Sequence, residues 1–230
     1  MTEFASTLPI PQERVLLQEL YHRISNEFFS AMSLVSLAAA RSSSHEVKVA
    51  LSGVRELLHH YAEVHQALQI PQDDARIDAA TYLSKLCLSV RRSKLDNMKI
   101  DLLLAAPPLE LQSDECWVLG MIVYELITNA ARHAFAGRDG EIRVELLRSG
   151  AFVQCKVLDN GAAAAHVQRG RGLKIVGELI KALDGRFEQK FGTTGSMSIL
   201  VFPYSGGSAR AQEQLPAKPG SLLLTSRRSG

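Results

Sequence analysis

The chain has 230 residues, 46% of them hydrophobic and 22% charged, and its formal net charge at pH 7 is +2. This composition is typical of a soluble globular protein and gives no support to a nucleic-acid partner. The longest strongly apolar run, residues 117–124, is too short to span a membrane, and the N-terminus lacks the pattern of a signal peptide. We therefore expect a cytoplasmic protein without a membrane partner.

Two amphipathic helices are predicted within residues 12–70, and in each the apolar residues recur at alternating steps of four and three, which is a heptad seam. Between them, Ser43 and Glu46 have the spacing of a capping box. The prediction is an antiparallel helical hairpin. The first seam comprises Leu17, Tyr21, Ile24, Phe28, Ala31, Val35 and Ala38, and the second comprises Val47, Leu51, Val54, Leu58, Tyr61, His65 and Leu68.

One hairpin cannot bury both seams together with the apolar residues beside them, such as Phe29, Met32, Leu57 and Val64. A four-helix bundle made from two chains would cover them, so we predict a homodimer through the hairpin. His65 lies on the second seam and is expected to be a packing residue.

Residues 75–203 have a mixed pattern that predicts an α+β layer sandwich. Residues 204–230 are rich in Ser, Gly, Pro and Ala and are predicted to be a disordered tail, whose Leu222–Leu224 is either a docking motif or without a structural role. Three widely spaced cysteines, Cys87, Cys116 and Cys155, are expected to be reduced and buried. The predicted elements are helices at 79–93, 113–136 and 172–183 and strands at 100–105, 141–147, 152–158, 186–190 and 196–202.

The helix predicted at 113–136 carries Glu125, Asn129 and His133 on one face, at intervals of four residues, opposite an apolar stripe that faces the core. A carboxylate, an amide and an imidazole in one row indicate a site, although a solvated polar face would have the same pattern. Downstream, Asp159-Asn160-Gly161 ends a strand and Gly170-Arg171-Gly172-Leu173 opens a helix. A carboxylate can accept a hydrogen bond from an exocyclic amino group, and glycines before a helix expose N–H groups to phosphate, so these residues favour a nucleotide.

In order, Glu125-x-x-x-Asn129, Asp159-x-Gly161, Gly170-x-Gly172-Leu173 and Gly192-Thr193-Thr194-Gly195 resemble the N, G1, G2 and G3 boxes of one ATPase superfamily. That superfamily comprises DNA gyrase, the MutL mismatch-repair protein and the histidine kinases. The resemblance implies that Asn129 ligates Mg²⁺ on the ATP phosphates, that Asp159 binds the adenine amino group and that Glu125 activates the attacking group. It further implies that the nucleotide is held by Arg132, His133, Gly161, Gly170, Gly172, Leu173 and Thr194.

The hairpin distinguishes among these relatives. Leu20-Tyr21-His22-Arg23-Ile24-Ser25-Asn26 resembles the phospho-acceptor helix of histidine kinases of the H-R-x-x-N type, and residues 64–68 match the same subfamily. With Tyr21 and Ile24 on the seam, His22 and Asn26 fall one turn apart on the outer face. A neutral imidazole is nucleophilic near pH 7, and its phosphoramidate is labile enough to pass the phosphoryl group on.

The resemblance implies a two-component histidine kinase that autophosphorylates His22 and donates the group to an aspartate of a response regulator. Three residues depart from the family pattern: Ala163 replaces a second glycine of the G1 box, the lid between Asp159 and Gly172 is short, and Glu27 stands where asparagine is common. These departures keep open an alternative, a histidine phosphotransferase that relays phosphoryl groups between response regulators without ATP. A pure interaction protein such as an anti-sigma factor fits less well. Residues 1–12 are too short to fold alone, so we expect input from a separate sensory or upstream signalling protein.

Overall fold

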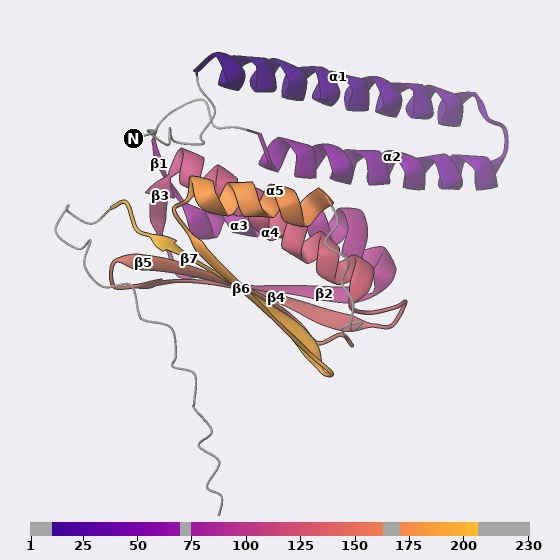
Figure 1. Cartoon of the computed structure of the whole chain (residues 1–230). Helices are drawn as coiled ribbons and strands as arrows, with labels where there is room; N and C mark the ends of the chain where they lie inside the picture. Colours follow the sequence, from indigo (N-terminus) through magenta and orange to yellow (C-terminus); the bar gives the residue numbers. More distant parts are fainter. Residues whose placement is uncertain (1–10, 70–74, 163–170, 207–230) are drawn as a thin grey trace, which may run out of the picture.

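The computed structural model describes residues 11–69, 75–162 and 171–206. It confirms the predicted α+β class: a helical hairpin precedes a sandwich in which helices cover one face of a sheet (Figure 1). The hairpin consists of α1 (Pro11–Arg41) and α2 (His45–Ala67). No helix among the described residues is long and apolar enough to cross a membrane.

The N-terminus of α2 differs from the prediction. Its cap is Ser44, whose extended backbone lets the side-chain oxygen accept a hydrogen bond from the Val47 N–H at 3.4 Å. The predicted capping box of Ser43 and Glu46 is therefore wrong by one residue. Neighbouring serines in a connector are equivalent by spacing, and only the local backbone angles select one of them.

The sandwich contains one five-stranded sheet among the described residues, with strand order β2-β4-β5-β7-β6. β2 pairs with β4 in parallel, and the pairs β4–β5, β5–β7 and β6–β7 are antiparallel. A separate ribbon, β1 with β3, was not predicted because each strand has three residues. In chain order the elements are β1 (Arg76–Asp78), α3 (Ala79–Val90), η1 (Arg91–Leu95), η2 (Asp96–Met98), β2 (Ile100–Ala105), β3 (Glu110–Gln112), α4 (Ser113–His133), β4 (Gly140–Ser149), β5 (Phe152–Asp159), α5 (Arg171–Ala182), β6 (Arg186–Gly192) and β7 (Gly195–Pro203).

The core lies between the sheet and the helices. Along β5, Val153, Cys155 and Val157 are buried in alternation, as expected for a strand with one covered face. All three cysteines are buried and free, as predicted, and burial raises the pKa of the Cys155 thiol to about 12. At the N-terminus of α4, the Gln112 N–H donates to Glu115 Oε2 at 3.0 Å in a capping box that fixes where the helix begins.

The end of α2 packs on the sandwich. Val64 and Leu68 are buried in the common core, and the Trp117 indole N–H donates to the Leu68 carbonyl at 2.9 Å. Val64 was expected to need a second chain, but the chain's own α/β layer covers it, because α2 packs against α3. The rings of Tyr21 and His65 lie 4.7 Å apart between the two helices, which agrees with the packing role predicted for His65.

Much of the remaining hairpin is not covered. The first seam is half-buried from Leu17 to Val35, whereas Ala38 is exposed. Of the second seam, Val47, Val54 and Tyr61 are exposed. The contacts inside one chain therefore bury part of the predicted heptad surface and leave the rest to solvent.

The segment after β7 continues to contact the domain. Tyr204 lies with its ring near the guanidinium groups of Arg76 and Arg148, and its N–H donates to the Ala151 carbonyl at 2.8 Å. The Ser205 hydroxyl donates to Glu115 Oε2 at 2.8 Å. Residues 207–230, which contain the rest of the predicted tail and Leu222–Leu224, lie outside the described residues.

Candidate functional site

The C-terminal half of α4 presents the predicted polar row. Glu125 and Asn129 are half-buried, and His133 is exposed. Within the described part of the chain, the side chains of Glu125 and Asn129 make no hydrogen bond.

The end of α4 comes earlier than predicted. The helix stops at His133 rather than at Ala136, because Ala134 is the C-cap and Ala136 adopts a left-handed conformation with φ of +49°. Phe135, between Ala134 and Ala136, is buried. Arg132 and His133 therefore occupy the last helical turn and are exposed beside the turn.

Asp159 is the best-defined group of the site. It ends β5, and its Oδ1 accepts hydrogen bonds from the backbone N–H of Gly161 at 3.0 Å and of Ser196 at 3.3 Å. The Ser196 hydroxyl donates to the other oxygen, Oδ2. A carboxylate offers about four acceptor positions, so three bonds fix its orientation and leave capacity for one donor from a ligand.

Ser196 was not among the predicted site residues. Thr194 was selected from the same box, but the structure places it in the exposed turn between β6 and β7, two residues from the contact with Asp159. The signal in the sequence that could have identified Ser196 was its position directly after Gly195. A hydroxyl there begins a strand that pairs with β5, which can be recognised once the strand register is known.

Two glycines of the boxes are required by close packing. A Cβ on Gly161 would overlap the backbone carbonyl of Ala134, which caps α4. A Cβ on Gly195, whose φ is +144°, would overlap the carbonyl oxygen of Asp159. These glycines bring the end of α4, the end of β5 and the β6–β7 hairpin together, and they place Asn129 and Asp159 at the same end of the sandwich.

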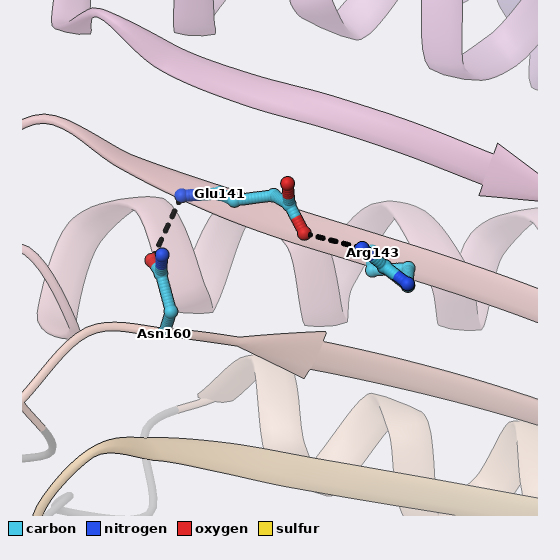
Figure 2. Close-up of polar contacts among 3 residues, drawn as sticks. All are labelled: Glu141, Arg143 and Asn160. Carbon is cyan, nitrogen blue, oxygen red and sulfur yellow. Dashed lines mark hydrogen bonds and ion pairs between the residues drawn. The ribbon is translucent and has the colours of Figure 1, made fainter.

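Asn160, between Asp159 and Gly161, has a structural contact (Figure 2). Its Oδ1 accepts a hydrogen bond from the Glu141 N–H at 2.8 Å, and its own N–H donates to the Glu141 carbonyl at 3.2 Å. The Glu141 carboxylate pairs in turn with Arg143 at 2.9 Å. Asn160 therefore joins the end of β5 to the start of β4 and holds the backbone next to Asp159.

The predicted glycine lid is described in part. Ala163 and Gly170 lie outside the described residues. Gly172 and Leu173 fall in the first turn of α5, in agreement with the helix predicted at 172–183.

His22 and Asn26 are exposed on α1, one turn apart, as predicted. Ser25, three residues after His22, accepts a hydrogen bond from Gln69 Nε2 at 3.4 Å, and the Trp117 indole near the start of α4 donates to the carbonyl of the adjacent Leu68. Asn129 follows Trp117 by twelve residues, which is about 18 Å along a helix that rises 1.5 Å per residue.

The residues present fit ATP with Mg²⁺. Mg²⁺ keeps several waters, and it binds through few protein oxygens together with substrate phosphates, so the single amide oxygen of Asn129 can suffice. Among the described residues no group of three or more His, Cys, Asp and Glu side chains forms a metal site. The Asp159 carboxylate has the acceptor capacity that an exocyclic amino group needs.

Comparisons with known proteins agree with the resemblance that these residues indicated. Residues 19–94 match the family described as histidine kinase. The sensor histidine kinase PdtaS of Mycobacterium tuberculosis is 30% identical over 182 residues, covering 74% of this chain and 35% of PdtaS. The chain thus spans 35% of the length of this relative.

Three solved structures share the fold. The histidine kinase domain of the Erythrobacter litoralis EL346 blue-light activated kinase has a TM-score of 0.57 at 20% identity, covering 78% of this chain and 96% of that one. A bacterial phosphotransferase has a TM-score of 0.54 at 11% identity, covering 85% and 98%. Full-length ShkA in complex with AMPPNP has a TM-score of 0.51 at 17% identity, covering 83% and 46%.

The predicted resemblance to the histidine kinases of two-component systems is therefore confirmed in sequence and in fold. The fold alone does not distinguish a kinase from a phosphotransferase, since it occurs in both.

Proposed function

We propose that this chain, which is similar to the histidine kinases of two-component systems, is a cytoplasmic protein-histidine kinase. It would transfer the γ-phosphoryl group of Mg·ATP to His22 and then to an aspartate of a response-regulator receiver domain. The observation that carries this proposal is the Asp159 carboxylate, oriented by Ser196 and Gly161 at the same end of the sandwich as Asn129 and Glu125. The match to sensor kinases supports it over the phosphotransferase alternative.

Each residue has a role that its position supports. Asp159 accepts a hydrogen bond from the adenine amino group. Asn129 supplies an oxygen ligand to Mg²⁺, which neutralises charge on the phosphates when bound. A ring nitrogen of His22 attacks the γ-phosphorus, an N–P bond forms and the P–O bond to ADP breaks. Glu125 takes or polarises the imidazole proton, and Asn26, one turn after His22, positions the ring.

The transfer requires His22 and Asn129 to meet. In the observed arrangement, His22 lies nearer the N-terminal end of α4, whereas Asn129 lies near its C-terminal end. Either the sandwich moves relative to its own hairpin, or it phosphorylates the hairpin of a second chain. The hairpin offers a surface for that second chain, because many of its large apolar side chains are exposed. These are Val15, Leu16, Leu20, Phe29, Leu34, Leu37, Val47, Val49, Val54 and Tyr61. Light scattering that shows a monomer at micromolar concentration would contradict the homodimer.

A phosphorylation assay tests the proposal. With [γ-³²P]ATP and Mg²⁺, the wild-type chain should incorporate acid-labile label. His22→Ala should abolish the incorporation, whereas His59→Ala, which removes another exposed histidine of the same hairpin, should retain it. Labelling that persists in His22→Ala would remove the acceptor assignment.

A nucleotide titration separates the kinase from the phosphotransferase. The kinase proposal requires saturable ATP binding below millimolar concentration. Absence of binding, together with intact transfer to the chain from a phosphorylated receiver domain, would establish the phosphotransferase instead. The identity of the receiver domain and of an upstream sensory protein would be sought by phosphotransfer profiling.

A further inference from the structure

An aromatic side chain continues the row of residues to which Asp159 belongs. In the sheet, Asp159 of β5 pairs with Ser196 of β7, and Ser196 pairs with Phe191 of β6. Residues paired in antiparallel strands project to the same face. Ile142, which pairs with Asp159 on its other side, is fully buried, so this is the helix-covered face.

The distance between Asp159 and Phe191 across this row can accommodate a nucleotide base. Neighbouring strands lie about 4.8 Å apart, so the backbone of Phe191 lies about 10 Å from that of Asp159. The hydrogen bonds from Ser196, on the strand between these two residues, hold the Asp159 carboxylate in place. A base that donates its amino group to Asp159 would therefore lie within reach of a side chain as long as phenylalanine.

The exposure of Phe191 distinguishes it from its neighbours on β6. Phe187, on the same face and opposite Leu200, packs against the core, and Gln189 donates from Nε2 to the Ser198 hydroxyl at 3.0 Å. Phe191 is 53% exposed and lies at the end of the edge strand, directly before Gly192. An apolar ring thus stands uncovered one strand beyond Ser196.

We propose that Phe191 is a nucleotide-binding residue, whose ring packs against the purine base that Asp159 holds by its amino group. This rests on the proposed function, since it deepens the same site. Asp159 selects for an exocyclic amino donor, and the phenyl ring adds contact with the apolar surface of the base. Binding of the triphosphate alone does not involve Phe191.

Two ligands and three variants test this inference. ATP and inorganic tripolyphosphate, which has no base, are titrated in the presence of Mg²⁺. Phe191→Ala should raise the Kd for ATP about tenfold, as expected for loss of an aromatic contact with a base, and leave the Kd for tripolyphosphate unchanged. Phe191→Trp should restore ATP binding. Leu103→Ala, which removes an exposed side chain from the opposite edge strand, is the matched control and should bind like wild type.

The outcomes separate this inference from the proposed function. If wild type binds no ATP, both are overturned. If wild type binds ATP and Phe191→Ala binds it equally well, the role of Phe191 alone is overturned. An equal loss for ATP and tripolyphosphate, or a lowered unfolding midpoint in Phe191→Ala, would show a structural role and overturn it as well.

Discussion

The two ends of α4 have opposite properties. At the N-terminal end, a capping box fixes the start of the helix, and the indole hydrogen bond of Trp117 to the buried Leu68 joins the helix to the hairpin that carries His22. At the C-terminal end, the side chains of Glu125 and Asn129 make no hydrogen bond among the described residues. One helix therefore anchors the phospho-acceptor hairpin at one end and presents ligand-binding groups at the other, so stability and chemistry can be altered separately.

The substitution with the largest expected effect impairs only the chemistry at the C-terminal end of α4. Asn129→Ala removes the proposed Mg²⁺ ligand and should lower the rate of His22 phosphorylation about 100- to 1000-fold, in the range found when one transition-state contact is removed. The unfolding midpoint should not change. Asn97→Ala, which alters an exposed asparagine of η2, should phosphorylate normally. A normal rate for Asn129→Ala at saturating Mg·ATP would contradict the assignment.

The second prediction tests the close packing of that end. Gly161→Ala should lower the free energy of unfolding by about 1–3 kcal/mol, because its Cβ meets the Ala134 carbonyl. Gly177→Ala in α5, where a Cβ has nothing within 4 Å, should be neutral or stabilising by about 0.5–1 kcal/mol. Urea denaturation measures both variants, and equal stabilities would refute the steric argument.

The third prediction compares two hydroxyls of the β6–β7 hairpin. Ser196→Ala removes a donor to Asp159 and should weaken ATP binding about fivefold, which corresponds to about 1 kcal/mol. Thr194→Ala should leave the affinity unchanged, because Thr194 lies in the exposed turn. A titration of both variants with ATP decides between the two, and the reverse order would support the predicted role of Thr194 in nucleotide binding.

The fourth prediction concerns the anchor at the N-terminal end. Trp117→Phe keeps a ring but leaves the Leu68 carbonyl without its donor, and it should cost about 1 kcal/mol of unfolding free energy. Hydrogen exchange at the end of α2 should accelerate. ATP affinity should stay at the wild-type value, since Asn129 lies at the other end of α4. A loss of ATP affinity would show that the two ends are coupled.

The smallest expected effect is a pH dependence at the anchor. Burial lowers the pKa of His65 below its ordinary value of 6.5, and its buried Nδ1 has no hydrogen-bond partner among the described residues. The unfolded chain therefore binds the proton more readily, so the stability is complete above pH 6.5 and is lost as the pH falls through the lowered pKa.

A matched pair of variants identifies the titrating residue. Measured between pH 7.5 and about 5, the loss should stay below about 1 kcal/mol. It should diminish in His65→Gln and persist in His59→Gln, whose side chain is exposed. Persistence of the full loss in His65→Gln would assign it to another group.

The sequence by itself determined what depends on neighbours along the chain. The heptad spacing predicted the hairpin, alternation predicted the strands of the large sheet, and the spacing within α4 placed Glu125 and Asn129 on one face. The order of the glycine boxes also indicated the family, which the comparisons confirm. These properties are local, because helix and strand periods repeat within a few residues.

The tertiary structure alone decided which distant groups meet. Ser196, rather than Thr194, contacts Asp159 across 37 positions of the chain, because the register of β5 and β7 sets which hydroxyl lies opposite the carboxylate. The tertiary structure also decided that the sandwich covers Val64 and that Phe191 lies in the same cross-strand row as Asp159. The spacing of side chains that share a face of a helix or strand depends on that segment alone. The partner of a side chain depends on how two segments are placed relative to each other, and that placement is fixed by the packing of the whole core.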